Sequence, residues 1–243
     1  MKSNLFLLFG IIVIFIACQG SESKFLIENQ PVPAHPRILL LKGEEERIKA
    51  AIVTDSTWGA LHQVILKECR KIIDAPVVVY KLEGRRLLEV SRTCRKRLFY
   101  LSYAYRMTGE TIFLQRAEKE LLNVVSFNDW NPAHFLDVAE MMWAVSLAYD
   151  WLYDGLAEST RKKTEQAIIR LGIEPSFEKE NNFWLQEDTN WNQVCNASLI
   201  LGALAIYEVN QELAQKVINR SIASVQLAMK GYEPDGTYAE GYQ

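Results

Sequence analysis

The stretch that decides the fold is residues 128–155, NDWNPAHFLDVAEMMWAVSLAYDWLYDG. Asn131 followed by Pro132 predicts a helix start, because an amide oxygen can cap free N–H groups and the first helical turn has no use for the N–H that proline lacks. Gly155 predicts the helix end, because glycine readily adopts the left-handed conformation of a C-terminal cap. We therefore expect one long helix from Asn131 to Gly155.

The apolar residues of this stretch cover two neighbouring faces of the expected helix. One stripe, spaced alternately by three and four residues, consists of Phe135, Val138, Met142, Val145, Tyr149 and Leu152. A second stripe consists of Met141, Ala144, Ala148 and Trp151. A helix with so wide an apolar face is covered from two sides, so we expect it in the inner layer of a multi-helix assembly.

A weak repeat extends this pattern along the chain. Ala104-Tyr105, Ala148-Tyr149 and Ala205-Ile206-Tyr207 each lie near the end of an apolar segment, and a polar turn and an amphipathic segment follow. The tyrosines are 44 and then 58 residues apart. Two-helix units that bury their faces against neighbouring units build α-solenoids and α/α toroids. The sequence predicts an all-α fold, an incomplete (α/α) toroid built of helical hairpins.

Helical periodicity predicts the remaining elements at residues 43–53, 57–73, 89–107, 111–125, 193–209 and 211–230. Ser56 and Thr57 are the expected cap of the second helix, and Gly231 the expected terminator of the last. Small residues in 193–209, Gly202 among them, predict another inner helix. The polar segment 174–192 is expected to be a long loop, and such loops on rigid scaffolds often carry function.

The N-terminus predicts export. Lys2 is followed by an apolar run at 5–16 that is short for a membrane span and typical of a signal peptide. Ile16-Ala17-Cys18 resembles a bacterial lipobox, which would make Cys18 a lipidated first residue; an ordinary signal peptide is the alternative. We expect a signal peptide at 1–18, a tether at 19–36 that adds little core, and a helical domain at 37–243 truncated at its C-terminus. The expected location is the periplasm or outer membrane of a bacterium.

The composition argues against several kinds of ligand, namely metal ions, cofactors and nucleic acid. Cys69, Cys94 and Cys195 lack metal-ligand spacing, so buried thiols are expected, while a Cys69–Cys94 disulfide stays open. With 3 histidines, the chain predicts no multi-histidine metal site, and no cofactor is expected apart from a structural metal in a C-terminal part beyond residue 243. The net charge of −3 argues against nucleic acid as a partner.

Positive charge nevertheless gathers between residues 85 and 106. Seven basic side chains stand there against Glu89 alone: Arg85, Arg86, Arg92, Arg95, Lys96, Arg97 and Arg106. Two interpretations stay open. Such a strip can steer an acidic ligand toward the protein, or it can be a solvated helix face.

Three polar clusters fall at equivalent ends of the expected inner helices. They are Asp129-Trp130-Asn131 with His134, then Asn190-Trp191-Asn192-Gln193, then Asp235-Gly236 with Tyr238, Glu240 and Tyr242. Amides, aromatic rings, an imidazole and phenols together are the equipment of a carbohydrate site. Each cluster alone also has a structural interpretation, such as a helix cap or core packing.

The order of several motifs resembles a known family. HPRILL, RLFYLSYAYRMTG, FNDWNPAHFLDVAEM, AYDWLYDGL, NWNQVCNASLILGALAI and PDGTYAEGY are similar to the N-terminal helical domain of heparinase II/III-type polysaccharide lyases, over most of residues 35–243. The resemblance implies an (α/α) toroid normally followed by β-sheet domains. It also implies a bacterial surface or periplasmic enzyme that cleaves uronic-acid-containing polysaccharides such as glycosaminoglycans or alginate.

The chemistry that the resemblance implies is β-elimination, which requires a neutralised uronate carboxylate and a nearby base. Asn190 and Asn192 are the expected neutralisers. Trp191 stands where related lyases have a histidine base, so His134 from the neighbouring helix end, or Tyr242, is expected to move protons. The expected substrate-binding residues are Trp130, Asn131, Trp191, Gln193, Tyr238 and Glu240.

Two other functions stay open. A glycoside hydrolase needs two carboxyl groups beside the scissile bond, and the candidates are Asp129, Asp188, Asp235 and Glu240. A lipid-anchored helical protein that binds glycans without turnover is the second. The uronate polymer, endo or exo action and the oligomeric state are open as well.

Overall fold

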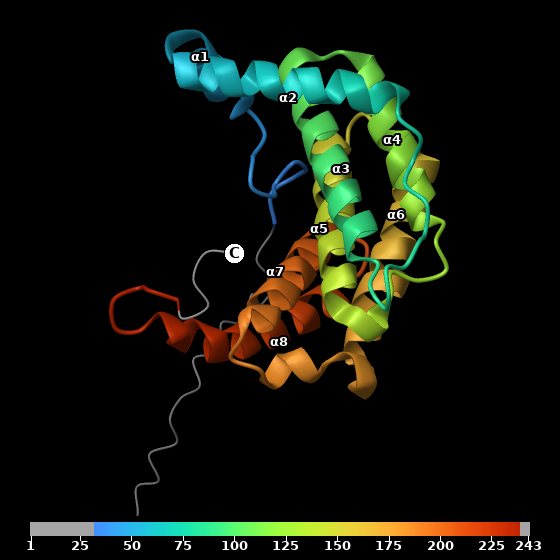
Figure 1. Ribbon diagram of the computed structural model, residues 1–243, viewed down its shortest axis with the longest axis vertical. Coiled ribbons are helices and arrows are strands. Elements are labelled where there is room, and N and C mark those ends of the chain that lie inside the picture. The colour runs from blue at the N-terminus through green and yellow to red at the C-terminus, as the bar shows by residue number, and fades with distance from the viewer. Residues whose placement is uncertain (1–31, 239–243) are drawn as a thin grey trace, which may run out of the picture.

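The computed structural model describes residues 32–238, and this part of the chain is all helical, without a β-strand (Figure 1). Its α-helices are α1 (Glu45–Thr54), α2 (Ser56–Asp74), α3 (Leu88–Thr108), α4 (Thr111–Val125), α5 (Phe135–Leu152), α6 (Glu158–Ala167), α7 (Asn190–Ala205) and α8 (Gln211–Met229). The predicted all-α class is confirmed.

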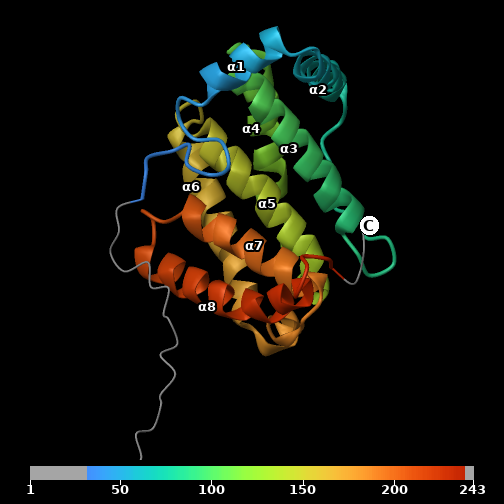
Figure 2. The same ribbon diagram turned by 90° about the vertical axis from the view of Figure 1, so that its left-hand side faces the viewer.

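Three helical hairpins form the body of the molecule. α3, α5 and α7 pack side by side in chain order, while α4 covers α3, α6 packs on α4 and α5, and α8 packs on α7 (Figure 2). α1 and α2 lie across one end of this body, with α2 against α3 and α4. The inner helices are those that the repeat predicts.

α5 is the central helix. All of its 18 residues are buried except Leu136 and Trp143. It packs against α3 on one side and α7 on the other, which confirms the expected cover on two sides. Its apolar side chains supply the middle of one continuous core that reaches from α2 to α8.

Neither residue that was predicted to cap α5 does so. Asn131 has left-handed backbone angles, φ 60° and ψ 62°, and its side chain caps no helix. A 3-10 turn, η1 (Pro132–His134), separates it from the helix start at Phe135. At the other end α5 stops at Leu152, and Gly155 has no positive φ. A Cβ atom on Gly155 would lie 3.0 Å from Leu114 Cδ2, so close packing explains this glycine.

Other helix ends differ from the predictions in smaller ways. Asp55, rather than Ser56 or Thr57, caps α2, and its carboxylate accepts hydrogen bonds from the backbone N–H groups of Thr57 and Trp58 at 2.7 and 3.2 Å. α8 continues into a 3-10 turn, η6 (Lys230–Tyr232), so Gly231 does not terminate it. α7 begins at Asn190, three residues earlier than expected.

The expected loop at 174–192 is mostly helical. After α6 the chain forms a π-helical segment, η2 (Ile168–Ile173), and three 3-10 turns, η3 (Glu174–Phe177), η4 (Lys179–Asn181) and η5 (Phe183–Gln186). Trp184 fixes this segment to the core. Its ring is fully buried 5.0 Å from the ring of Phe135, and its indole N–H donates to the Asn181 carbonyl at 2.9 Å. The segment therefore supports the starts of α5 and α7.

The segment before α1 is anchored to α5 through one buried carboxylate. Asp150 accepts hydrogen bonds from the backbone N–H of Arg37 at 3.0 and 3.1 Å and from that of Ile38 at 2.8 Å. The His35 ring lies 2.6 Å from Asp150 through Nδ1 and stacks on Tyr153 at 4.2 Å. His35, which the sequence assigns to the tether, is thus part of the core.

The three described cysteines, Cys69, Cys94 and Cys195, are free and buried, so the alternative Cys69–Cys94 disulfide is wrong. Burial raises the pKa of the Cys69 thiol to about 12 and raises that of Cys94 further. No helix within residues 32–238 has the length and apolar character needed to cross a membrane. Cys18, Glu240 and Tyr242 lie outside the described residues.

Candidate functional site

The three polar clusters are connected at the N-terminal end of α7. The His134 ring at the start of α5 meets the Trp191 ring edge to face, with centroids 5.0 Å apart. Gln193 Oε1 accepts a hydrogen bond from the Tyr232 hydroxyl at 2.8 Å, and the Tyr232 ring stacks on Tyr238 at 4.8 Å. His134 and Trp191, which are about 60 residues apart in the sequence, therefore lie in one region.

His134 is oriented by a buried carboxylate that sequence reasoning missed. Its Nδ1 lies 2.8 Å from Asp137 Oδ1, and Asp137 is fully buried. A carboxylate that carries its charge only accepts hydrogen bonds, so this contact favours the tautomer with the proton on Nδ1, in which Nε2 keeps its lone pair. The spacing of three residues on one helical turn is the signal that could have identified the pair.

The same carboxylate joins α5 to the loop before α3. Asp137 Oδ2 accepts from the Leu87 backbone N–H and from the Asn131 side-chain amide, each at 2.6 Å. The Asn131 amide also donates to the Arg85 carbonyl at 2.8 Å. Asn131, expected to bind substrate, instead positions Asp137 and this loop, and asparagine is among the residues that tolerate its left-handed backbone.

A cleft of about 450 Å³ opens beside the imidazole and is lined by Glu83, Gly84, Arg85, Arg86, Ala133 and His134. Residues 83–86 form a tight hairpin in which Glu83 and Arg86 exchange backbone hydrogen bonds at 2.9 and 3.1 Å. Gly84 has φ 61°, which suits glycine at this turn. The His134 side chain is 14% exposed, enough for its ring to border the cleft.

An aromatic surface continues from the imidazole. The ring of Phe183, which is 51% exposed, lies 5.3 Å from the ring of half-buried Trp191. Phe183, Trp191 and His134 thus form a row of rings. Such rings offer apolar faces to a ligand with apolar and polar sides, which a sugar has. Phe183 lies in a segment expected to be an irregular loop, and its partner could not be predicted.

Two expected site residues are buried and cannot reach a polysaccharide in this structure. Trp130 is fully buried, and its indole N–H donates to the Val124 carbonyl at 3.0 Å. Asn192 is fully buried between α7 and α8, where its amide donates to Ser224 Oγ at 2.9 Å and the Trp184 carbonyl at 3.1 Å. Both assignments are corrected to structural roles. Asn190 is half-buried in the first turn of α7.

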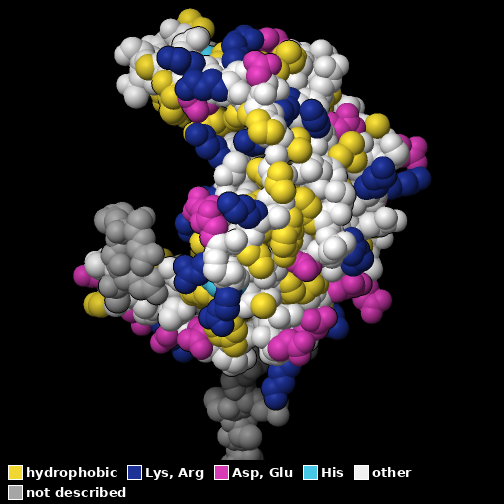
Figure 3. Space-filling model, turned by 45° about the vertical axis from the view of Figure 1, so that its right-hand side comes forward, with side chains coloured by type: hydrophobic (Ala, Val, Ile, Leu, Met, Phe, Trp, Pro, Cys, Tyr) yellow, Lys and Arg dark blue, Asp and Glu magenta, His cyan; other side chains and the backbone are white. Residues whose placement is uncertain are grey.

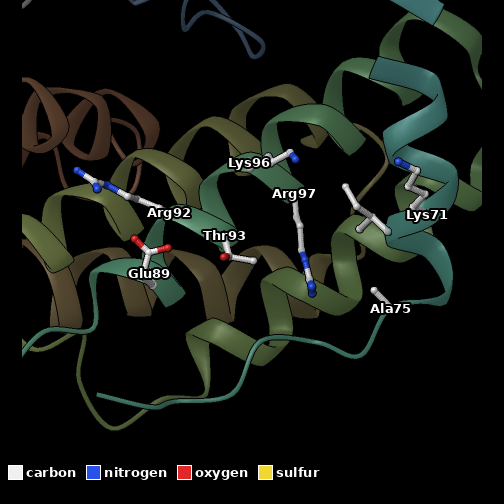
Figure 4. Close-up of a pocket in the computed structure, with 8 residues that line it drawn as sticks. Lys71, Ala75, Glu89, Arg92, Thr93, Lys96 and Arg97 are labelled. Carbon is white, nitrogen blue, oxygen red and sulfur yellow. The ribbon is translucent and has the colours of Figure 1, made fainter. Parts of the chain in front are cut away.

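Most side chains of the basic strip contact an acidic partner, and three of these acids are each shared by two cations. Five of its seven side chains form ion pairs: Arg92 and Arg95 with Glu140, Lys96 with Glu68, Arg97 with Glu120, and Arg106 with Glu45. A pocket of about 440 Å³ lies at this strip, between the end of α2 and α3. Figure 4 shows the residues that line it. Lys71, Arg92, Lys96 and Arg97 line it together with Glu89.

Arg85 and Arg86 differ from the other five. Both are exposed and form no ion pair with any residue in 32–238. Figure 3 shows a hollow on one side of the molecule with Lys and Arg side chains at its border. The interpretation as a solvated helix face is therefore correct for Arg92, Arg95 and Lys96, whereas Arg97 and Arg106 are largely buried. Ligand steering remains a hypothesis for Arg85 and Arg86.

The carboxylates expected for a hydrolase are held in separate turns. Asp129 accepts from the Tyr80 hydroxyl at 2.7 Å and the Asn131 backbone N–H at 2.8 Å. Burial and this bond to Asp129 raise the pKa of Tyr80 to about 12. Asp235 accepts from the Thr237 backbone N–H at 3.0 Å within its own turn. Asp188 is exposed.

Among the described residues, no three His, Cys, Asp or Glu side chains are grouped to hold a metal ion. In comparisons with known proteins, no protein-family model matches this sequence, and no curated protein matches it.

Proposed function

We propose that the protein is a polysaccharide lyase that cleaves uronic-acid-containing polysaccharides by β-elimination. The observation that carries the proposal is the His134–Asp137 pair at the edge of a cleft with two arginines that form no ion pair within residues 32–238. An imidazole oriented by a buried carboxylate beside a cleft is the arrangement that a general base needs. The motif order that resembles heparinase II/III-type lyases supports the same function.

The proposed reaction assigns each proton. His134 Nε2 removes the proton at C5 of the uronate, the electron pair left behind forms the C4–C5 double bond, and the C4–O4 bond breaks. The leaving oxygen takes a proton, for which Tyr242 is the proposed donor. Asn190 in the first turn of α7 is the proposed neutraliser of the carboxylate, and the positive end of the α7 dipole adds to it. Trp191 and Phe183 are proposed to stack against sugar rings.

The architecture, the location and the partner of the protein are part of the same proposal. Three packed hairpins are compatible with part of an (α/α) toroid, which supports the proposed architecture. Export to the periplasm or outer membrane and lipid attachment at Cys18 rest on the N-terminal sequence. The proposed partner is an acidic polysaccharide, with no role for nucleic acid.

Incubation of the protein with alginate and with heparin, followed by ultraviolet absorbance and a reducing-sugar assay, tests the proposal. A lyase produces unsaturated ends that absorb in the ultraviolet together with new reducing ends. Reducing ends without ultraviolet absorbance would show a hydrolase and contradict the proposal. Binding of either polymer without any product would favour the glycan-binding alternative.

A further inference from the structure

We infer that the hairpin at residues 83–86 is a subsite for an anionic group of the glycan, with Arg85 and Arg86 as its contacts. The inference rests on the proposed function for the ligand class, a polysaccharide. It names the side chains that would select an acidic polymer. The resemblance assigned this role to asparagines. One of those asparagines, Asn192, is fully buried and cannot take that role.

The charge of the cleft favours an anionic ligand. Each of the other five cations of the strip contacts an acidic side chain, whereas Arg85 and Arg86 form no ion pair within residues 32–238. Among the described residues that line the cleft, Arg85 and Arg86 give two positive charges against the one negative charge of Glu83. Guanidinium groups match the geometry of carboxylate and sulfate oxygens through paired N–H donors.

Hydrogen bonds fix the position of the hairpin relative to His134. The hairpin is tied to the start of α5 by the hydrogen bond from the Asn131 amide to the Arg85 carbonyl and by the one from the Leu87 N–H to Asp137. Asp137 is also the group that orients the His134 ring. One buried carboxylate therefore fixes both the proposed base and the backbone that carries the arginines. An anion held at the hairpin would keep its sugar at a set distance from His134.

The test uses the double variant R85A/R86A and a matched control, R47A/K49A. The control removes the same charge from α1, where exposed Arg47 and half-buried Lys49 pair with Glu44 and Glu46. Binding is measured by calorimetry with two probes, alginate oligosaccharides that carry only carboxylates and heparin oligosaccharides that also carry sulfates. Circular dichroism checks folding, which the variant should retain because its ties to α5 involve backbone atoms of the hairpin.

We expect R85A/R86A to bind at least about tenfold more weakly, from lost hydrogen bonds to a charged group, and the control to bind like the wild type. Weaker binding of both probes would identify a carboxylate as the bound group, and weaker binding of heparin alone would identify a sulfate. Unchanged binding of both probes, an equal loss in the control, or no binding by the wild-type protein would overturn the inference.

The assay for unsaturated product separates this inference from the proposed function. Binding that depends on the arginines, without any unsaturated product, would leave the subsite in place and contradict the lyase. Unsaturated product formed at the wild-type rate by R85A/R86A would overturn the subsite and leave the lyase in place.

Discussion

Two buried carboxylates at opposite ends of α5 hold distant segments in place. Asp137 binds the loop before α3, and Asp150 binds the segment before α1, across 50 and 113 residues of sequence respectively. A buried carboxylate is tolerated only when donors surround it, so each acts as a fixed point for the backbone around it. Sequence periodicity assigns both residues to an apolar helix, and nothing local in the sequence reveals the distant backbone groups that they bind.

Loss of the carboxylate at Asp150 should destabilise the protein strongly. We expect Asp150→Ala to lower the free energy of unfolding by about 3–5 kcal/mol, because His35 and the backbone N–H groups of Arg37 and Ile38 lose their acceptor. Asp154→Ala is the matched control, since Asp154 is 74% exposed and pairs with exposed Lys42. Its change should stay within about 0.5 kcal/mol.

Urea unfolding measures both variants, with stability taken from the midpoint and slope. Equal midpoints for Asp150→Ala and the wild type would show that the segment before α1 is not anchored as described.

Among the elements, α5 and α7 depend on small residues for their close contact. The end of the Met142 side chain lies between Gly172 of η2 and Gly202 of α7, where added Cβ atoms would come within 2.0 Å of Cε and 2.5 Å of Sδ respectively. The small residues of 193–209 therefore predict the inner position of α7 correctly. The partner methionine could not be predicted, because it depends on the register between helices.

Gly202→Ala should destabilise the protein even though alanine favours a helix by about 1 kcal/mol. Overpacking against fully buried Met142 costs about 1–3 kcal/mol, and three Met142 atoms lie within reach of the new methyl group. A thermal or urea melt gives the change. In the double variant with Met142→Ala the penalty of the Gly202 change should disappear, and additive effects of the two substitutions would contradict the contact.

Helix positions were predictable, whereas several residues expected to cap or terminate a helix do not do so. The apolar spacing placed α4 at its observed bounds and most others within a few residues. Asn131 and Gly155 failed as end signals because other contacts, the Asn131 bond to Asp137 and the packing of Gly155 on Leu114, override local preference. Gly231 failed because α8 continues through it into η6. Segment 174–192 escaped prediction because short 3-10 turns have too few residues to show a period.

At the scale of the molecule, one core joins the helical hairpins and the α2 end. Cys69 on α2, Cys94 on α3 and Cys195 on α7 are all buried in it. Buried thiols with raised pKa values react slowly, since the thiolate is the reactive form. Their reactivity therefore reports whether the described part of the chain unfolds as one unit.

Thiol labelling across a urea series should show these three cysteines protected in the native state and exposed in one shared transition. Cys18→Ser removes the remaining cysteine of the 4 in the chain, so that the signal comes from these three. Mass spectrometry then assigns each label. Exposure of Cys69 at much lower urea than Cys195 would instead show that α2 separates before the body unfolds.

The candidate site is assembled from three segments, and this limited its prediction from sequence. His134 and Trp191 were predictable as site residues by type, and the structure places their rings together. Trp130 and Asn192 looked equivalent to them in sequence, yet their neighbours bury them completely. Asp137 and Phe183 belong to the site only because they contact His134 and Trp191 respectively.

The role of His134 as base is the central claim, and the rate of unsaturated product release by His134→Ala tests it most directly. General base catalysis contributes about 10²–10⁴-fold, so a loss of that size is predicted. His62→Ala is the control, because His62 lies on α2, where its Nδ1 is 3.0 Å from the Tyr103 hydroxyl. It should keep the wild-type rate. A His134→Ala protein that is folded and releases product as fast as the wild type would contradict the account.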